Sequence, residues 1–319
     1  MTKQRYDALL FFSFGGPEKH EDVIPFLENV LRGKNVPRER MLEVAEHYYH
    51  FDGQSPINDH CREMIAALKV EFAENGVELP IYWGNRNWAP MLGDTVKQMK
   101  ADGVERALAY VTSAFSSYSG CRQYREDLGN AGEIETEKIP SYFNHPGFIE
   151  TMIDRVKTAI DALPGATVIY TAHSIPIAQA STSPYVEQLT YAAGKVNEAL
   201  GLGPVTLVYQ SRSGPPSQPW LEPDVSDWLR ATEAKKVVVV PIGFLSDHME
   251  VLFDLDTEAA QLARELGIEM VRAKTAGTHP RFVRAVREMV QDALANGITS
   301  ICKVDCCQSG RPVGARPGL

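Results

Sequence analysis

The stretch VVVVPIGFLSDHMEVLFDLDTEAAQLA (residues 237–263) decides the fold of this chain. Four consecutive valines, Val237 to Val240, are typical of a parallel strand that is buried on both faces. Pro241 and Gly243 end this run, and the residues after them show the spacing of a helix. The stretch therefore predicts one strand–loop–helix unit of an α/β protein.

Acidic side chains gather in the same stretch. Glu250, Asp254 and Glu258 recur every four residues, so an ideal helix would align them in one stripe. No Lys or Arg lies within the stretch, so we expect these like charges to repel one another without a neighbouring cation. A solvated acidic face would account for three carboxylates alone. His248 lies beside them after a strand, where α/β sheets bind ligands, and this favours a site for a divalent cation.

Strand-like apolar runs alternate with helical patterns along most of the chain. The runs are at residues 8–14, 81–84, 107–112, 167–172, 206–210, 237–241 and 268–272. This alternation predicts an α/β protein with two Rossmann-like domains, each a parallel sheet flanked by helices, and an active-site crevice between them. Two of the runs lead into a proline, in FGGP and HSIP, and this weak internal repeat also indicates two units.

The expected domain limits follow from these patterns. We place the first domain at residues 5–130 together with 279–296, and the second at 131–278. Residues 298–319 form a cysteine-containing tail without helical or strand periodicity. Such a tail needs an attachment to be ordered.

Composition narrows the class of protein. The net charge of -9 argues against nucleic acid or an anionic membrane as the main partner. No transmembrane segment or signal peptide is apparent, so we expect a cytoplasmic protein. Five cysteines do not make a disulfide framework in a chain of 319 residues. Three of them, Cys302, Cys306 and Cys307, are crowded together near the end, which indicates a metal or a cluster.

A second histidine follows another predicted strand. His173 lies in TAHSIP, directly after the run at 167–172. A lone histidine in such a place is more often a loop residue whose hydrogen bonds are satisfied. Because His248 and Glu250 also follow a strand, we expect all three to face one crevice. A neutral imidazole is both a proton acceptor and a metal ligand.

Several motifs occur in the same order in the ferrochelatases, which insert Fe²⁺ into a porphyrin late in haem synthesis. They are FSFGGPE, GQSPIN, GNRNW, SSYSGCRQY, TAHSIP, QSRSGPP and PIGFLSDHMEVLFDLD. The chain resembles this family from about residue 6 to residue 297. A nicotinamide dehydrogenase is a poorer match, because no G-x-G-x-x-G opens a helix after a strand.

The resemblance implies a role for each candidate residue. His173 and Glu250 would be the catalytic pair that binds the substrate Fe²⁺ or removes the pyrrole protons. Asp254 and Glu258 would continue an acidic row that passes metal in or protons out, on a helix that is partly π-type in the family. Phe14 stands where several bacterial members have a tyrosine, so it is expected to contact the porphyrin, and iron ligation from this position is in doubt.

The segment between the first strand and GQSPIN is short and polar, which bears on the substrate. Arg32, Lys34, Ser55 and Tyr124 resemble groups that hold the propionates of coproporphyrin III, whose four carboxylates need such donors. We therefore expect a coproporphyrin ferrochelatase that forms coproheme, acts as a monomer, and supplies a coproheme decarboxylase. The alternatives are a protoporphyrin IX ferrochelatase and a non-catalytic tetrapyrrole-binding module.

The cysteines resemble the ligands of a [2Fe-2S] cluster that some ferrochelatases carry. Cys121 matches the ligand upstream, and Cys302, Cys306 and Cys307 stand for the three in the tail. The spacing C-x3-C-C departs from the usual wider spacing of the family. Four thiolates also suit Zn²⁺, so either a [2Fe-2S] cluster or a zinc ion could occupy this one site.

Overall fold

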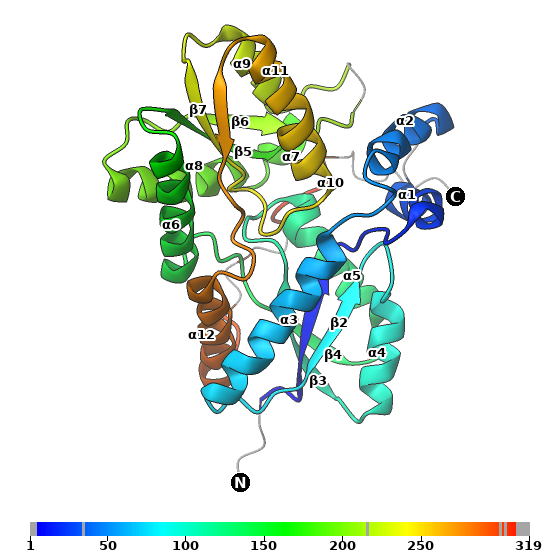
Figure 1. Ribbon diagram of the computed structural model, residues 1–319. Coiled ribbons are helices and arrows are strands. Elements are labelled where there is room, and N and C mark those ends of the chain that lie inside the picture. The colour runs from blue at the N-terminus through cyan, green and yellow to red at the C-terminus, as the bar shows by residue number, and fades with distance from the viewer. Residues whose placement is uncertain (1–4, 34–35, 215–216, 300–301, 303–304, 311–319) are drawn as a thin grey trace.

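The computed structural model describes residues 5–33, 36–214, 217–299, 302 and 305–310. Two four-stranded parallel sheets form the framework, with strand orders β2-β1-β3-β4 and β6-β5-β7-β8 (Figure 1). The second sheet therefore repeats the topology of the first, and the predicted α/β fold with two parallel sheets is confirmed. The strands are β1 Ala8–Ser13, β2 Ile81–Asn85, β3 Arg106–Val111, β4 Glu135–Lys138, β5 Thr167–His173, β6 Leu207–Gln210, β7 Lys236–Val240 and β8 Glu269–Arg272.

Burial explains why most strands were predictable. All six residues of β1 and the four valines of β7 are buried, as expected for strands covered by helices on both faces. β4 was not predicted, because its sequence ETEK is charged and partly exposed. It forms by pairing with β3, from Arg106 opposite Glu135 to Ala109 opposite Lys138. The first sheet therefore extends past residue 130, where the first domain was expected to end.

Helices flank both sheets. They are α1 Val23–Leu31, α2 Arg38–Tyr49, α3 Ile57–Glu74, α4 Leu92–Ala101, α5 Gln123–Ala131, α6 Pro146–Ala162, α7 Ile177–Ala180, α8 Tyr185–Leu200, α9 Val225–Ala231, α10 Met249–Val251, α11 Ala260–Glu265 and α12 Pro280–Asn296. Three short helices of other types are η1 His20–Asp22, η2 Tyr118–Arg122 and η3 Leu252–Ala259. α6 and α12 each begin with a proline after a capping histidine, which favours helix initiation.

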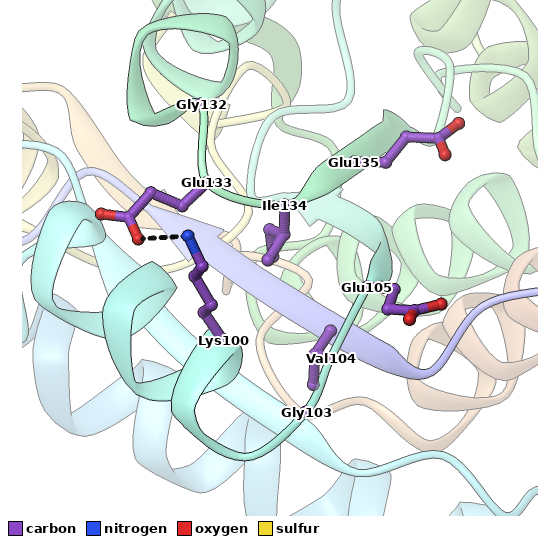
Figure 2. A pocket seen from close by; sticks show the side chains of 8 residues that line it. All are labelled: Lys100, Gly103, Val104, Glu105, Gly132, Glu133, Ile134 and Glu135. Atoms are coloured by element: carbon purple, nitrogen blue, oxygen red, sulfur yellow. Dashed lines mark ion pairs between the residues drawn. The ribbon is translucent and has the colours of Figure 1, made fainter.

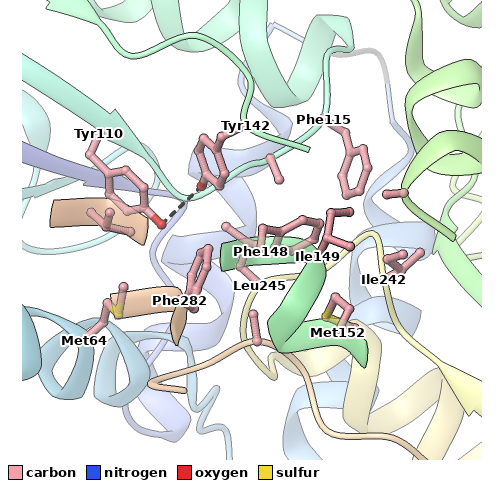
Figure 3. Packing of buried hydrophobic residues seen from close by; sticks show 14 of the residues in the cluster. Met64, Tyr110, Phe115, Tyr142, Phe148, Ile149, Met152, Ile242, Leu245 and Phe282 are labelled. Atoms are coloured by element: carbon pink, nitrogen blue, oxygen red, sulfur yellow. Dashed lines mark hydrogen bonds between the residues drawn. The ribbon is translucent and has the colours of Figure 1, made fainter. Parts of the chain in front are cut away.

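One hydrophobic core joins the two sheets. Figure 3 shows Tyr110 of β3 beside Tyr142, with Phe148 of α6 and Phe282 of α12 packed close to them. The hydroxyl of Tyr142 donates a hydrogen bond to that of Tyr110 at 3.2 Å. Residues from both halves of the chain thus share one buried cluster, which holds the sheets in a fixed relation.

Helix α12 packs against both α3 and α6 (Figure 1). Its Arg287 pairs with Glu71 of α3, with 2.8 Å between Nε and Oε1. Residues 279–296 thus pack against the first domain, as expected, and to a similar extent against α6 of the second. The domain limits stay a prediction. Among the described helices, none combines the length and apolar character that crossing a membrane requires.

Candidate active site

The candidate site lies where the strands of the second sheet end. β5 ends at His173 and β6 ends at Gln210, and these two residues are neighbours in the sheet register. β7 leads through a loop to α10 and then to η3, which is a π-helix. The resemblance implied π-type geometry in this helix, and the structure bears this out. Such helices are rare and occur often at functional sites.

His173 and Glu250 face each other at this edge, with 3.5 Å between Nε2 and Oε1. Nδ1 of His173 donates to the carbonyl oxygen of Ser174, which leaves Nε2 directed at Glu250. Burial alone lowers the pKa of His173, but the charge and hydrogen bond of Glu250 outweigh it and raise this pKa to about 9. The side chains are 32% and 42% exposed, so a substrate can reach the pair.

Asp254 and Glu258 follow Glu250 along η3. Burial raises the pKa of Asp254 to about 7, although Ser211 donates a hydrogen bond to its carboxylate. The charges of Glu250 and Glu258 act in the same direction as burial. Burial also raises the pKa of Glu258. These carboxyl groups therefore include one that exchanges a proton near neutral pH.

Two other acidic residues of the segment have a structural role. Arg272 of β8 lies 3.0 Å from Asp247 and 2.6 Å from Asp256, measured between nitrogen and oxygen atoms. Thr275 also donates to Asp247 at 3.0 Å. Arg272 lies outside the acidic stretch in sequence but packs against it in space, so it pairs with two acidic residues that are not part of the row Glu250, Asp254 and Glu258.

His248 caps the helix that carries the acidic row. Its Nδ1 accepts a hydrogen bond from the backbone N–H of Glu250 at 3.2 Å, and its ring meets that of Phe244 edge to face. Burial lowers the pKa of His248, so the ring is neutral at neutral pH. A neutral ring is required for this cap, because only an unprotonated nitrogen accepts.

The first half of the chain reaches the same site through α2. The ring of His47 stacks on Phe253 of η3, with centroids 3.8 Å apart and planes 11° from parallel. Burial, and then the charges of Glu250 and Asp254, raise the pKa of Tyr48. α2 therefore lies close to the acidic row, although it belongs to the short polar segment far away in sequence.

Two of the predicted porphyrin contacts lie on accessible parts of the first half. Phe14 follows β1 and is partly buried, with its ring edge-on to Phe26 at 6.3 Å. Arg32 follows α1, is exposed, and donates to the side-chain oxygen of Asn29. Lys34 lies outside the described residues. All three stay predictions as porphyrin contacts.

The other two predicted contacts are buried. Ser55 is 4% exposed, and its backbone N–H donates to the carbonyl of Pro17 at 2.9 Å. Tyr124 of α5 is also 4% exposed, with the guanidinium of Arg86 over its ring at 4.9 Å. Burial raises the pKa of Tyr124 to about 12, so its hydroxyl stays protonated. Each contact with a propionate stays a prediction, and each would require a way in from the surface.

The cysteine tail is attached to both halves of the chain. Arg122 of η2 donates to the carbonyl of Cys306 at 3.0 Å, and the backbone N–H of Cys307 donates to Thr182 at 3.0 Å. Cys121 and Cys307 are buried. The sequence predicted that the tail would be ordered only if it were attached to the rest of the chain. The hydrogen bonds of Cys306 and Cys307 provide such an attachment for the described residues.

The four thiols influence one another. Burial, and then neighbouring Cys306 and Cys121, raise the pKa values of Cys302 and Cys307, the latter to about 12. Cys306 shares a hydrogen bond with each of these two thiols. Four cysteine sulfurs are the type of ligand that binds zinc or a [2Fe-2S] cluster. Within the ranges that the structure describes, however, no three His, Cys, Asp or Glu side chains are arranged to hold a metal ion.

A hollow of about 580 Å³ lies at the opposite edge of the first sheet (Figure 2). Its lining comes from the segments before β3 and β4, and Lys100 pairs there with Glu133 at 3.3 Å. Ligands of α/β sheets bind at the other edge, where the strands end. We therefore assign no role in the reaction to this open, acidic hollow.

Two residues of the site were missed in the sequence. Gln210 donates from Nε2 to the backbone carbonyl of Glu250 at 2.7 Å, and Ser211 donates from Oγ to Asp254. Both stand at the end of the predicted strand at 206–210. Their position at the end of a predicted strand, like that of His173, could have marked them as site residues. Their side-chain types did not point to a particular role.

Comparison of the sequence with known proteins assigns the chain to a family. The sequence model described as Ferrochelatase matches residues 6–294. The chain is 55% identical to the ferrochelatase of Rhodopirellula baltica over 97% of this chain and 98% of that one. It is 46% identical to the coproporphyrin III ferrochelatase of Streptomyces coelicolor (98% and 96% covered) and 48% identical to that of Mycolicibacterium smegmatis (91% and 90% covered).

Solved structures agree on the fold. The sirohydrochlorin chelatase SirB from Bacillus subtilis subspecies spizizenii, in complex with cobalt, superimposes with a TM-score of 0.56 at 13% identity, covering 91% of this chain and 95% of that one. CbiX, the terminal enzyme of sirohaem biosynthesis in denitrifying bacteria, gives 0.55 at 13% identity, with 90% and 99% covered. At this identity the similarity concerns the fold, which is that of the chelatases.

Proposed function

Because the chain belongs to the ferrochelatase family, we propose that it inserts Fe²⁺ into coproporphyrin III to give coproheme. The observation that carries the proposal is the facing pair of His173 and Glu250, 3.5 Å apart at the edge of the second sheet. The sequence motifs predicted a ferrochelatase, which is a metal chelatase, and the family match over residues 6–294 confirms this prediction.

The proposed reaction exchanges two pyrrole protons for one ferrous ion. His173 and Glu250 offer an imidazole nitrogen and a carboxylate oxygen, both of which bind ferrous iron. With its pKa raised to about 9, His173 holds a proton on Nε2 at rest. An approaching dication repels that positive charge, so the proton leaves as the iron arrives. The pair would then be ready to pass the ion to the porphyrin nitrogens.

The acidic row gives the released protons a path. Asp254, whose pKa is raised to about 7, both accepts and releases a proton near neutral pH. A group with a pKa near the working pH is the most effective proton carrier. Glu258 lies one step further along the same helix. We assign proton exit or metal entry to this row.

The choice of coproporphyrin III rests on charge. The segment around α1 and α2 is short and polar, and Arg32 is exposed at the end of α1. The substrate carries four carboxylates, and guanidinium groups bind carboxylates well. Several relatives with 42–51% identity are named coproporphyrin III ferrochelatases, which supports the same choice.

An anaerobic absorbance assay tests the proposal. Purified protein is mixed with Fe²⁺ and either coproporphyrin III or protoporphyrin IX, and the change of the porphyrin spectrum is followed. Faster metallation of coproporphyrin III supports the proposal. Preference for protoporphyrin IX would assign the chain to that branch, and binding without metallation of either porphyrin would indicate a tetrapyrrole-binding module.

We also propose that Cys121, Cys302, Cys306 and Cys307 hold one [2Fe-2S] cluster, with zinc as the competing occupant. The hydrogen bonds that Cys306 shares with Cys302 and Cys307, and the influence of Cys121 on both, support a common site. A cluster bound there would supply a cross-link between the tail and η2. The four thiolates would have to lose their protons on binding.

The setting that we propose is the cytoplasm. All five cysteines are free, which suits a reducing compartment. A monomer that receives coproporphyrin III and delivers coproheme to a decarboxylase is the assembly that fits the proposed reaction.

A further inference from the structure

Gln210 connects the second sheet to the helix that carries the acidic row. It is the last residue of β6 and lies beside His173 of β5 in the sheet register. Its side chain is 1% exposed. From this buried position Nε2 donates to the backbone carbonyl of Glu250 at 2.7 Å and lies 3.4 Å from Oδ2 of Asp254.

The orientation of this amide is fixed by its surroundings. Among the residues that the structure describes, the other end of the amide, Oε1, has no hydrogen-bond partner. The reverse orientation would set Oε1 against the Glu250 carbonyl and the Asp254 carboxylate, which are both acceptors. A buried acceptor without a partner is unfavourable. The amide therefore keeps the orientation in which Nε2 donates to Glu250 and Asp254, although Oε1 then lacks a partner among the described residues.

The next residue makes a second connection. Ser211 has a φ of 62°, which lies in the left-handed region that a residue with a side chain rarely adopts. In this conformation its hydroxyl donates to Asp254. Such backbone conformations persist where surrounding contacts hold them, and they are frequent at functional sites. Two consecutive residues thus tie the end of β6 to one face of the helix.

The position of these contacts matters because η3 is a π-helix. Glu250 lies just before it and Asp254 is its third residue. The helical register decides whether the carboxylates of both residues point to the same side. π-helical turns are rare, so contacts from outside the helix have to select this register.

We infer that Gln210 is a positioning residue, which holds the carbonyl of Glu250 and thereby keeps the Glu250 carboxylate opposite His173. This inference rests on the proposed function, in which that pair handles the substrate iron. Without the donated hydrogen bond, the first turn of the helix would shift away from β6. The distance between His173 and Glu250 would then no longer be fixed.

Three variants test this role in the full-length protein. Gln210→Met keeps the length of the side chain and removes the donor. Gln210→Asn keeps the amide and withdraws it by one methylene. Thr171→Val is the matched control, because Thr171 of the neighbouring strand β5 is equally buried and its hydroxyl has no described partner.

The expected result is a loss of kcat of about 10- to 100-fold in both Gln210 variants, since a small misplacement near reacting groups has this effect. KM for coproporphyrin III should stay within about threefold of the wild type, because the porphyrin is held by other residues. The affinity for Co²⁺, titrated in the absence of porphyrin, should fall in both Gln210 variants and also in Glu250→Gln. Thr171→Val should match the wild type in all three measurements.

The outcomes separate two kinds of failure. If the wild type metallates neither porphyrin, the proposed function is overturned, and if Glu250→Gln and His173→Ala remain active, the assignment of this pair and the inference that rests on it are overturned. If those two are inactive while Gln210→Met and Gln210→Asn keep wild-type kcat and Co²⁺ affinity, the positioning role alone is overturned. A lower kcat together with a higher KM and a lower melting temperature would also overturn the positioning role, because these changes together indicate general destabilisation. Should Gln210→Met not fold, the milder Gln210→Asn decides.

Discussion

His47 of α2 stacks on Phe253 of η3, so a helix from the first half of the chain rests directly on the helix that carries the acidic row. The centroids are 3.8 Å apart. Phe253 is flanked in sequence by the first π-helical residue and by Asp254. The contact therefore places α2 over the site that we assign to metal insertion.

His47→Ala should loosen α2. An aromatic pair contributes about 0.5–1.5 kcal/mol beyond its buried area, so opening of α2 should become roughly 2- to 12-fold more frequent. Amide hydrogen exchange of residues 38–49 measures this change. Leu42→Ala is the control, because Leu42 lies on the same helix and is 42% exposed. Unchanged exchange in His47→Ala would mean that other contacts hold α2.

His173→Ala and Glu250→Gln should each lower the rate of metal insertion by about 10²- to 10⁴-fold, the usual effect of removing a positioned acid or base. The anaerobic absorbance assay measures the rate, and circular dichroism verifies folding. His145→Ala is a matched control, since His145 caps α6 away from the site. Activity within about threefold of the wild type in either site variant would contradict the assigned pair.

Asp254→Asn should make stability less dependent on pH. The folded pKa of Asp254 is raised from 3.8 to about 7, so the folded state binds this proton more tightly than the unfolded state does. Wild-type stability therefore falls as the pH rises from about 4 to about 7, and this group contributes at most about 1.4 kcal/mol of that loss for each pH step of one. Asparagine resembles the protonated acid and removes this dependence.

Thermal unfolding at a series of pH values checks that expectation. The melting temperature of Asp254→Asn relative to the wild type should rise between pH 4 and pH 8. A constant difference over this range would show that Asp254 titrates at its ordinary pKa. Asp161→Asn serves as the control, because Asp161 is an exposed carboxylate that pairs with Lys157 on the surface.

Coproporphyrin III should be metallated at least about tenfold more efficiently than protoporphyrin IX. A charge-assisted hydrogen bond contributes about 1.5–3 kcal/mol, so Arg32→Ala should lower kcat/KM for coproporphyrin III by roughly 10- to 150-fold. Lys97→Ala is the control, since this exposed lysine of α4 pairs with Asp94. Equal efficiencies for both porphyrins would favour the protoporphyrin branch.

Protein purified without oxygen should contain two irons and two sulfides and be reddish-brown if the thiolates hold a [2Fe-2S] cluster. Cys121→Ser should lose the colour and melt at a lower temperature. A cross-link over so long a loop contributes about 4 kcal/mol or more in the chain-entropy model. Cys61→Ala should keep the colour, because Cys61 lies in the hydrophobic core. One zinc in colourless protein would contradict the cluster but keep the site; no metal would contradict both.

The sequence alone determined the fold class and the main candidates for chemistry. Val237 to Val240 predicted a buried strand, and the proline-started helices at 146 and 280 follow from local preferences of the chain. The motifs around His173 and Glu250 identified the family, because such motifs are recognised from the order of residues alone and require no knowledge of contacts in space. These features depend on neighbours along the chain, which a sequence displays directly.

Only the tertiary structure decided which partners Asp247, Asp254 and Asp256 have. Arg272 of β8 pairs with Asp247 and Asp256, and Ser211 donates a hydrogen bond to Asp254. The charged strand β4 likewise exists only because β3 offers it a hydrogen-bonding edge. The physical reason is common to all of these. The free energy of an ion pair, a hydrogen bond or a sheet ladder depends on distances in space, and residues far apart in sequence acquire those distances only when the chain folds.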